Sequence, residues 1–512
     1  MRYAIAAGLA MLACGYVATT AGGSGTARAA GPGGAQACAA VTAKQFGAAT
    51  ATGAWHDADA TKGLPAYCEV TGTLKPVPGS NIGVVYRLPD NWNGEVYGIG
   101  GGGWIGNISL QAATEALQKG FATMQTDGGH PIGSVWDNSW AIDPDKAKDF
   151  SYRAIHEMTV HGKTLADAYY GRKHTASVYV GCSTGGRMGL MEAQRFPEDY
   201  DGIVAGAPVY TLQTQTTGLM RTNQFAAPGA AFTADDLKLA QDSALAQCDA
   251  ADGLKDGLIN NPHACHWDPA TIQCSGAKTA SCLAAPQVVA LKSLYDGIKS
   301  PDGQWAMWPI MRGGETGWSF FIGTAGKPDG TGGGGLTGLK PEIFPNRDVD
   351  WAHFSAATDV PVVRASAFAK MYEAKDPNLA KFFARGGKLL LWHGESDPGP
   401  SPVGTLDYAR QVVAQNPRAA QQFRVFLAPG VGHCGGGAGA DVLPVTDVID
   451  SWVHTNAAPE TVVATKRDKS LTRLDCAWPK VAHYNGSSEP NDPSSWECVA
   501  ERGPSSRPGE RG

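Results

Sequence analysis

The feature that most constrains the fold is the stretch 177–187, Ser-Val-Tyr-Val-Gly-Cys-Ser-Thr-Gly-Gly-Arg. Four strand-like residues run into a G-x-S-x-G pattern centred on Ser183, and a helix-like run over 187–196 follows. In this pattern the serine lies on a sharp turn, where a Cβ at either flanking glycine would crowd the backbone. The turn predicts a nucleophilic hydroxyl at a helix N-terminus, where the dipole favours developing negative charge. An ordinary glycine turn is the alternative, because the chain contains 66 glycines.

Two later strand-like runs each deliver a residue that such a serine requires. The run 388–392 leads to Asp397, and the run 423–427 leads to His433. The chain order Ser, Asp, His is that of α/β-hydrolases. We expect Ser183 to attack, His433 to take and return its proton, and Asp397 to orient and stabilise the imidazole. His393, close to Asp397, is the rival base, but it does not follow the end of a strand.

Cysteines stand beside both the serine and the histidine. Cys182 precedes Ser183 and Cys434 follows His433, so a serine–histidine hydrogen bond would bring the two thiols within disulfide range. This arrangement, with the aspartate between, resembles the tannase and feruloyl esterase family, which includes an enzyme that hydrolyses mono(2-hydroxyethyl) terephthalate. The resemblance covers most of the mature chain and implies an α/β-hydrolase core with an inserted lid domain.

The N-terminus is typical of an export signal over residues 1–29. Arg2 supplies positive charge, residues 4–13 are apolar, and residues 27–29 form an A-x-A cleavage site. The apolar run is too short to span a membrane. Lipid attachment at Cys14 is an alternative, so we expect a secreted or periplasmic protein, or an outer-membrane lipoprotein.

The rest of the chain divides by composition. We expect a catalytic domain over 30–208 and 377–502, a lid domain over 209–376 where strand–helix alternation gives way to Gly, Pro and Trp, and a disordered tail over 503–512. A net charge of -6 and 18% charged residues favour neither nucleic acid nor a membrane surface as partner. A small aromatic ester is the expected partner, and the oligomeric state is not predicted.

Ten cysteines remain after the signal, an even number that indicates a disulfide framework in an exported protein. Structural zinc would need paired C-x₂₋₄-C units, which the sequence lacks. Proximity and the family pattern imply the pairs Cys38–Cys68, Cys182–Cys434, Cys248–Cys265, Cys274–Cys282 and Cys476–Cys498.

A glycine-rich run over 98–106 follows a strand-like segment, 95–99. In α/β-hydrolases the loop after this strand supplies one donor to the oxyanion. We expect that donor to be an amide of Gly102 or Gly103, with the Thr184 amide as the second. A plain flexible loop is the alternative. A dinucleotide-binding loop is less supported, because no downstream ribose-binding acid is evident.

Three carboxylates crowd one loop of the predicted lid, at Asp249, Asp252 and Asp256. They would repel one another unless a hard cation joined them, and calcium accepts such oxygens together with main-chain carbonyls. The resemblance implies a structural Ca²⁺ site completed by the carbonyls of Leu254 and Leu258. Solvated Asp-Gly turns are the alternative.

Aromatic residues gather later in the predicted lid, at Trp318, Phe320 and Phe321. They are candidates for stacking on a planar acyl group, although such clusters more often form core. We therefore expect a serine esterase acting on esters of hydroxylated aromatic acids, of feruloyl esterase or tannase type. A terephthalate monoester hydrolase is the alternative, although the resemblance implies an acidic residue after the nucleophile there, where this chain has Thr184. A non-catalytic polyphenol- or carbohydrate-binding protein is the alternative from another class.

Overall fold

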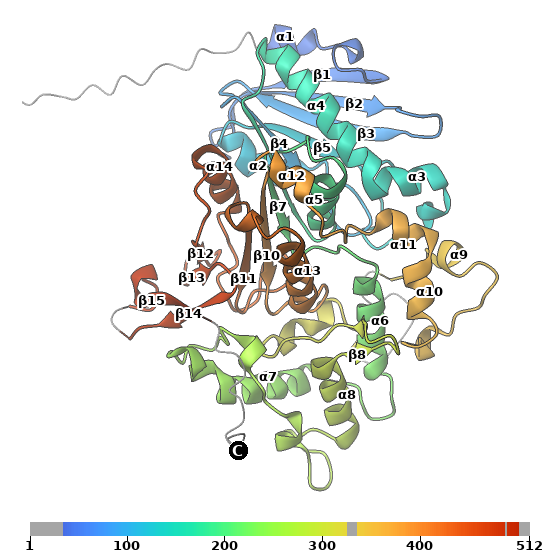
Figure 1. The fold of residues 1–512 in the computed structure, drawn as a ribbon, viewed down its shortest axis with the longest axis vertical. Coiled ribbons are helices and arrows are strands. Elements are labelled where there is room, and N and C mark those ends of the chain that lie inside the picture. Colours follow the sequence, from blue (N-terminus) through green and yellow to red (C-terminus); the bar gives the residue numbers. More distant parts are fainter. Residues whose placement is uncertain (1–33, 325–334, 487–488, 501–512) are drawn as a thin grey trace, which may run out of the picture.

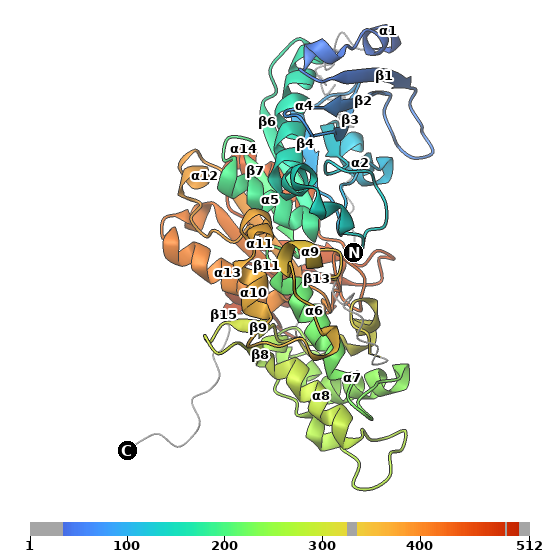
Figure 2. The ribbon, with the colours of Figure 1, turned by 90° about the vertical axis from the view of Figure 1, so that its right-hand side faces the viewer.

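The computed structural model describes residues 34–324, 335–486 and 489–500 (Figure 1). The predicted export signal, Cys14 and the predicted tail over 503–512 therefore lie outside the described residues. The strands of the main sheet and its flanking hairpins run through one half of the molecule, and the helices α7 and α8 occupy the opposite end (Figures 1 and 2).

The main sheet has nine strands in the order β1-β2-β3-β5-β4-β6-β7-β10-β11. Their bounds are β1 Thr50–His56, β2 Tyr67–Leu74, β3 Ile82–Pro89, β4 Glu95–Ile99, β5 Ala122–Thr126, β6 Ala176–Cys182, β7 Gly202–Gly206, β10 Lys388–Gly394 and β11 Phe423–Ala428. From β5 to β11 neighbouring strands are parallel, whereas β1, β2, β3 and β5 pair antiparallel. This mixed sheet confirms the predicted α/β-hydrolase class.

Helices cover both faces of the sheet, which explains why its parallel strands are largely buried and mostly apolar. The helices are α1 Ala35–Ala39, α2 Leu110–Gln118, α3 Pro144–Lys148, α4 Ala154–Tyr170, α5 Thr184–Arg195, α6 Gln213–Gln224, α7 Ala234–Cys248, α8 Ala285–Asp296, α9 Lys340–Ile343, α10 Val360–Ala365, α11 Ala367–Tyr372, α12 Ala380–Ala384, α13 Pro402–Gln415 and α14 Val445–Thr455. Successive residues of β6 face opposite ways: Val178 packs in a core with α2 and α14, and Tyr179 in a core with α4, α5 and α13.

The segment between β7 and β10, which we call the insertion, runs from residue 207 to residue 387. It contains α6 to α12 and a short hairpin, β8 Ile298–Lys299 with β9 Trp305–Met307. A separate hydrophobic core built around α7 and α8 includes Leu237, Leu291 and Trp318. The helices α10 and α11 lie inside the predicted lid range, yet Phe368 and Tyr372 of α11 pack in the main core instead.

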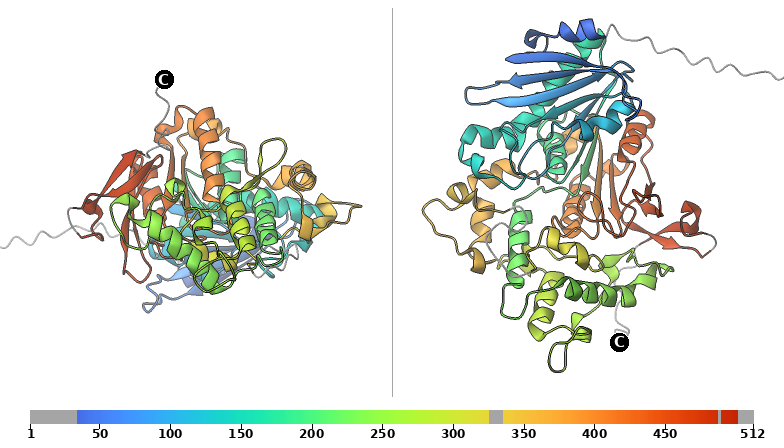
Figure 3. Two further views of the ribbon diagram at one scale, coloured as in Figure 1. Left: turned by 90° about the horizontal axis from the view of Figure 1, so that it is seen from below. Right: turned by 180° about the vertical axis from the view of Figure 1, so that it is seen from behind.

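Two hairpins follow the last helix, β12 Thr461–Thr465 with β13 Thr472–Cys476 and β14 Lys480–Tyr484 with β15 Trp496–Ala500. Seen from behind, the β14–β15 hairpin projects from the side of the molecule next to the insertion (Figure 3). The structure contains the five predicted disulfides, with the predicted pairing. None of the helices in the described ranges is long and apolar enough to cross a bilayer.

Candidate active site

Ser183 stands at the turn between β6 and α5 with a strained backbone, φ 63° and ψ −123°. Its amide donates to the carbonyl of Gly206 at 2.9 Å, which ties the turn to the end of β7. A Cβ at Gly181 would lie 2.5 Å from the backbone of Gly185, and one at Gly185 would lie 2.9 Å from the Gly101 carbonyl oxygen. Both glycines of the motif are therefore required by close packing, as a nucleophile turn needs.

Asp397 follows β10 and is shared by two histidines. Its Oδ2 lies 2.7 Å from His433 Nδ1 and 3.1 Å from His393 Nε2. Burial acts to raise the pKa of this carboxyl, but the charge of His433 and the hydrogen bonds from both histidines outweigh it and lower the pKa to about 2. Asp397 thus stays ionised, and its bond to Nδ1 leaves His433 Nε2 available to act as a base.

His393 is held away from the reaction as a second partner of Asp397. Its ring is fully buried, and Nδ1 lies 2.8 Å from Thr405 Oγ1. With Nε2 also on Asp397, both ring nitrogens are engaged. His393 is therefore placed to orient Asp397 and not to compete with His433 for the serine proton.

The predicted disulfide between Cys182 and Cys434 joins the Ser183 turn to the His433 loop, with the two Cα atoms 5.9 Å apart. Ser183 and His433 consequently line one cavity of about 30 Å³. Its other lining residues are Gly103, Trp104, Trp136, Thr184, Val209, Thr214, Gln215, Phe321, Gly399 and Pro400. Ser183 and His433 thus share one cavity, and Asp397 is joined to it through its 2.7 Å contact with His433 Nδ1.

Two free amides face this cavity. Among the hydrogen bonds of the described residues, the Gly102 amide donates to the Ile105 carbonyl at 3.2 Å, whereas the Gly103 amide has no acceptor. Thr184 is the first residue of α5, so its amide is one of those left free at a helix N-terminus. The Thr184 hydroxyl donates to the Gly103 carbonyl, and this hydrogen bond joins the start of α5 to the glycine-rich loop after β4. Of the two predicted glycines, Gly103 fits the oxyanion role and Gly102 does not.

The predicted aromatic residues take three different positions. Trp318 is 1% exposed in the core of the insertion and lines neither cavity beside His433. Phe321 stands edge-on to the His433 ring, with centroids 4.9 Å apart. Phe320 is 69% exposed and lines a larger cavity of about 370 Å³ on the other side of His433, with Gln241 and Thr316.

Arg221 of α6 was not predicted, yet it ties the insertion to the loop that carries Asp397. Its guanidinium is fully buried and donates to the carbonyls of Pro398 and Gly399 at 2.9 and 3.2 Å. It also donates to the carbonyls of Trp308 and Pro309 at 3.0 and 2.9 Å. Burial lowers the pKa of Arg221, and the negative charge of Asp397 opposes that shift.

The predicted calcium loop offers carboxylate and main-chain carbonyl oxygens as possible metal ligands. Asp249 accepts from the amides of Asp256 and Gly257, and Asp252 accepts from the amide of Leu254. Burial raises the pKa of Asp252 to about 6, and the neighbouring charges of Asp256 and Asp249 add to that shift. Carboxylates and main-chain carbonyls are the donor types that Ca²⁺ takes, so these residues fit the ion by donor type, but Asp256 Oδ2 already pairs with the guanidinium of Arg473. Calcium there remains a prediction.

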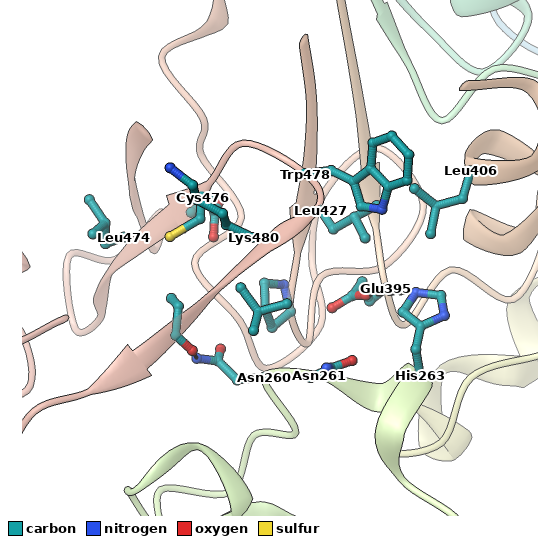
Figure 4. Close-up of a pocket in the computed structure, with 14 residues that line it drawn as sticks. Asn260, Asn261, His263, Glu395, Leu406, Leu427, Leu474, Cys476, Trp478 and Lys480 are labelled. Carbon is teal, nitrogen blue, oxygen red and sulfur yellow. Dashed lines mark hydrogen bonds and ion pairs between the residues drawn. The ribbon is translucent and has the colours of Figure 1, made fainter. Parts of the chain in front are cut away.

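A further buried cavity lies where the insertion, the main core and the C-terminal hairpins meet (Figure 4). His263 of the insertion lies 3.1 Å from Glu395, which directly follows β10. Asp475 of β13 lines the same cavity, and burial, with the charge of Glu395, raises its pKa well above the usual range. The cavity of about 30 Å³ suffices for an ordered water. Arg221 contacts the chain just after Asp397, and His263 contacts it just before, so the insertion reaches the Asp397 loop from both sides.

Comparison with known proteins places this geometry in a family. The family model for tannase and feruloyl esterase matches residues 68–309 and 339–499. The mono(2-hydroxyethyl) terephthalate hydrolase of Piscinibacter sakaiensis is 33% identical over 87% of this chain and 88% of its own. A probable feruloyl esterase of Arthroderma benhamiae is 32% identical over 85% of this chain and 86% of its own.

Solved structures agree. Feruloyl esterase B from Aspergillus oryzae superposes with a TM-score of 0.79 at 25% identity, covering 91% of this chain and all of that one. The tannin acyl hydrolase of Aspergillus niger, at 21% identity and a TM-score of 0.71 over 88% of this chain and 90% of its own, shares the fold. The chain belongs to the tannase and feruloyl esterase family of carboxylic ester hydrolases.

Proposed function

We propose that this protein is a serine esterase that hydrolyses esters of hydroxylated aromatic acids. The observation that carries the proposal is the meeting of Ser183 and His433 at one cavity, with an ionised Asp397 on His433 Nδ1 and two amides that have no acceptor within the described residues. Membership of a family whose named relatives include feruloyl esterases supplies the substrate class.

In the proposed reaction Ser183 Oγ bonds to the ester carbonyl carbon while His433 Nε2 takes its proton. The carbonyl oxygen becomes an oxyanion held by the amides of Gly103 and Thr184. Collapse breaks the bond to the alcohol oxygen, which leaves with the proton from His433. Water then adds to the acyl-serine in the same way, and the free acid and Ser183 are released.

We also propose that the protein is exported and that it carries a structural Ca²⁺. Five disulfides favour an oxidising compartment. The ion would be held by Asp249, Asp252 and Asp256 with the carbonyls of Leu254 and Leu258, in the insertion and away from the ester. Elemental analysis of the purified protein tests this: one calcium per chain is expected, and metal-free protein with an unchanged Tm would reject the site.

Methyl ferulate, methyl gallate and mono(2-hydroxyethyl) terephthalate should be compared by kcat/KM on the wild type and on Ser183→Ala. We expect one of the two phenolic esters to lead, and Ser183→Ala to lose about 10⁴-fold or more in kcat. Equal turnover by the two proteins would refute the nucleophile, whatever the ranking of the esters. Ser401→Ala is the matched control, since that serine donates to the carbonyl of Pro309 and lines neither cavity beside His433.

The terephthalate monoester is the second candidate substrate, because the 33% identical relative is named for it. The same panel decides between the two. A terephthalate ester that leads by tenfold or more would replace the phenolic assignment and leave the mechanism intact.

A further inference from the structure

A fully buried carboxylate without a partner lies on α5, well away from Ser183. Glu192 is 0% exposed, and neither of its carboxylate oxygens has a hydrogen-bond partner within the described part of the chain. Burial raises the pKa of Glu192 well above the ordinary value, and both the neighbouring charge of Asp199 and a proton shared with the Asp199 carboxyl add to that shift. An uncompensated buried carboxylate is costly, so a cation or a proton must share this site.

Two further ligand-type side chains complete the cluster. His156 Nδ1 lies 2.6 Å from Asp199 Oδ2, and one donor atom from each of His156, Glu192 and Asp199 lies within 4.8 Å of the others. The three come from α4, from α5 and from the segment before β7, and α4 and α5 lie on the same face of the sheet. The His156 side chain is 29% exposed, which gives an ion a path from solvent.

Lys163 is the neighbouring cation, but it does not neutralise the pair directly. Its Nζ donates to the main-chain carbonyl of Asp199, and no hydrogen bond from it to either carboxylate occurs among the described residues. Burial lowers the pKa of Lys163, with the charges of Asp199 and Asp201 opposing that shift. Lys163 therefore leaves the side-chain carboxylates of Glu192 and Asp199 without a hydrogen bond from an ammonium group.

We propose that His156, Glu192 and Asp199 bind a divalent transition-metal ion of the zinc type. One imidazole nitrogen and two carboxylate oxygens form a donor set that Zn²⁺ accepts with a water as fourth ligand. Bonds of about 2.0–2.2 Å place tetrahedral ligand atoms about 3.3 Å apart, so small side-chain shifts close these donors on an ion. The imidazole favours a transition metal over calcium or magnesium.

Such an ion would act as a structural link. Glu192 lies nine positions after Ser183 along α5, roughly 13 Å at the rise of an α-helix. The ion would join α4, α5 and the start of β7 without touching an ester. Its loss should therefore change thermal stability and leave kcat for a small ester unchanged.

A second cluster provides the matched control. Glu95, Asp450 and His454 also place three donor atoms within 4.8 Å. There too a histidine nitrogen contacts a carboxylate, His454 Nε2 with Glu95 Oε1 at 2.7 Å, but the His454 side chain is 47% exposed. Substituting His454 removes a similar histidine from a similar cluster and leaves the proposed ion in place.

The test is a Zn²⁺ titration of chelator-treated full-length protein in excess Ca²⁺, followed by calorimetry and by Tm. For the wild type we expect one equivalent bound and a Tm rise of roughly 2–5 °C at saturating ion. His156→Gln and Glu192→Gln should bind at least about tenfold more weakly, whereas His454→Gln should match the wild type. Replacing Zn²⁺ with Co²⁺ should give the visible absorption of a tetrahedral site in the wild type only.

Several results would overturn the site. They are a wild type that binds no Zn²⁺ at micromolar concentration, binding lost only in His454→Gln, and undiminished binding by His156→Gln. If Glu192→Gln has a higher Tm than the wild type in chelator, and Zn²⁺ changes neither the Tm nor the heat signal of the wild type, then a shared proton and not a metal ion occupies the site. Because His156 is partly exposed, its variant serves as the test even if Glu192→Gln fails to fold.

Discussion

The main sheet and the insertion hold their two sides of the active site in different ways. Ser183 and Asp397 follow β6 and β10, the two strands on either side of β7, and each position is fixed by parallel ladders on both sides of its strand. The insertion contributes Phe321 from an irregular segment, and Thr214 and Gln215 from α6, and neither segment has a strand ladder to the sheet. One buried guanidinium, that of Arg221, supplies much of its polar attachment.

This difference indicates that the sheet positions the catalytic groups, whereas the insertion supplies contacts to the substrate. The catalytic groups, which must meet within hydrogen-bonding distance, lie at strand ends and beside a disulfide. Strand ladders and the disulfide together fix their positions. Groups that touch only the substrate stand on irregular segments, which tolerate exchange of side chains. Substitutions in the sheet half should therefore reduce the reaction rate most, and substitutions in the insertion should act through stability and selectivity.

The largest effect is expected at Asp397. Asp397→Asn should lower kcat about 10⁴-fold, because the amide no longer stabilises the cation of His433 or fixes its tautomer. Steady-state kinetics on a soluble phenolic ester would measure this. Asp407→Asn, a carboxylate on α13 that pairs with Gln411, is the control and should leave kcat within about twofold. A small loss at Asp397 would mean that His393 or another group replaces it.

The disulfides give the next contrast. Replacing Cys182 and Cys434 by serine should cost about 5 kcal/mol on chain-entropy grounds, because the loop spans 252 residues. Replacing Cys274 and Cys282, whose loop spans 8 residues within the insertion, should cost about 2–3 kcal/mol. Denaturant unfolding would measure both. Only the first pair should also lower kcat, and equal kinetic effects of the two would contradict the proposed division of tasks.

Arg221→Lys should lower both stability and kcat, although Arg221 contacts only main-chain carbonyls near Asp397. Lysine cannot span four carbonyls from one plane, and each one left unpaired costs about 1–3 kcal/mol, so we expect a net loss of about 2–4 kcal/mol in stability. A shift of the Asp397 loop should also lower kcat by roughly 10–100-fold. Arg312→Lys, which removes a guanidinium donor to the Trp267 carbonyl, serves as the control. Unchanged kcat in a destabilised Arg221→Lys protein would show that the insertion does not influence Asp397.

The smallest effect is expected at Phe320, which is largely exposed in the larger cavity. Phe320→Ala should leave stability within about 0.5 kcal/mol. It should lower kcat/KM about 2–10-fold for an ester with a bulky alcohol, through a stacking contact of about 0.5–1.5 kcal/mol, and leave a methyl ester unchanged. An equal loss for both esters would place Phe320 in the binding of the acid instead.

The sequence predicted the parts of the fold and the site that depend on residues close together in the chain. The turn at Ser183 required its glycines, and the cysteines beside Ser183 and His433 anticipated their meeting. Arg221 gave no signal, because an arginine on a polar helix is ordinary until four distant carbonyls surround it. The buried position of Trp318 was equally hidden, since a Gly- and Trp-rich segment looks the same whether its rings line a cavity or fill a core. Long-range packing decides both cases.

The four carbonyls gathered by Arg221 bear on how an ester enters. Two of them belong to the insertion and two to the loop just after Asp397. A hinged opening of the insertion would have to strip that guanidinium of its acceptors and would dislodge the carboxylate on which His433 depends. We therefore expect the insertion to stay in place when an ester binds, and the ester to enter through side-chain rotations of residues such as Phe321.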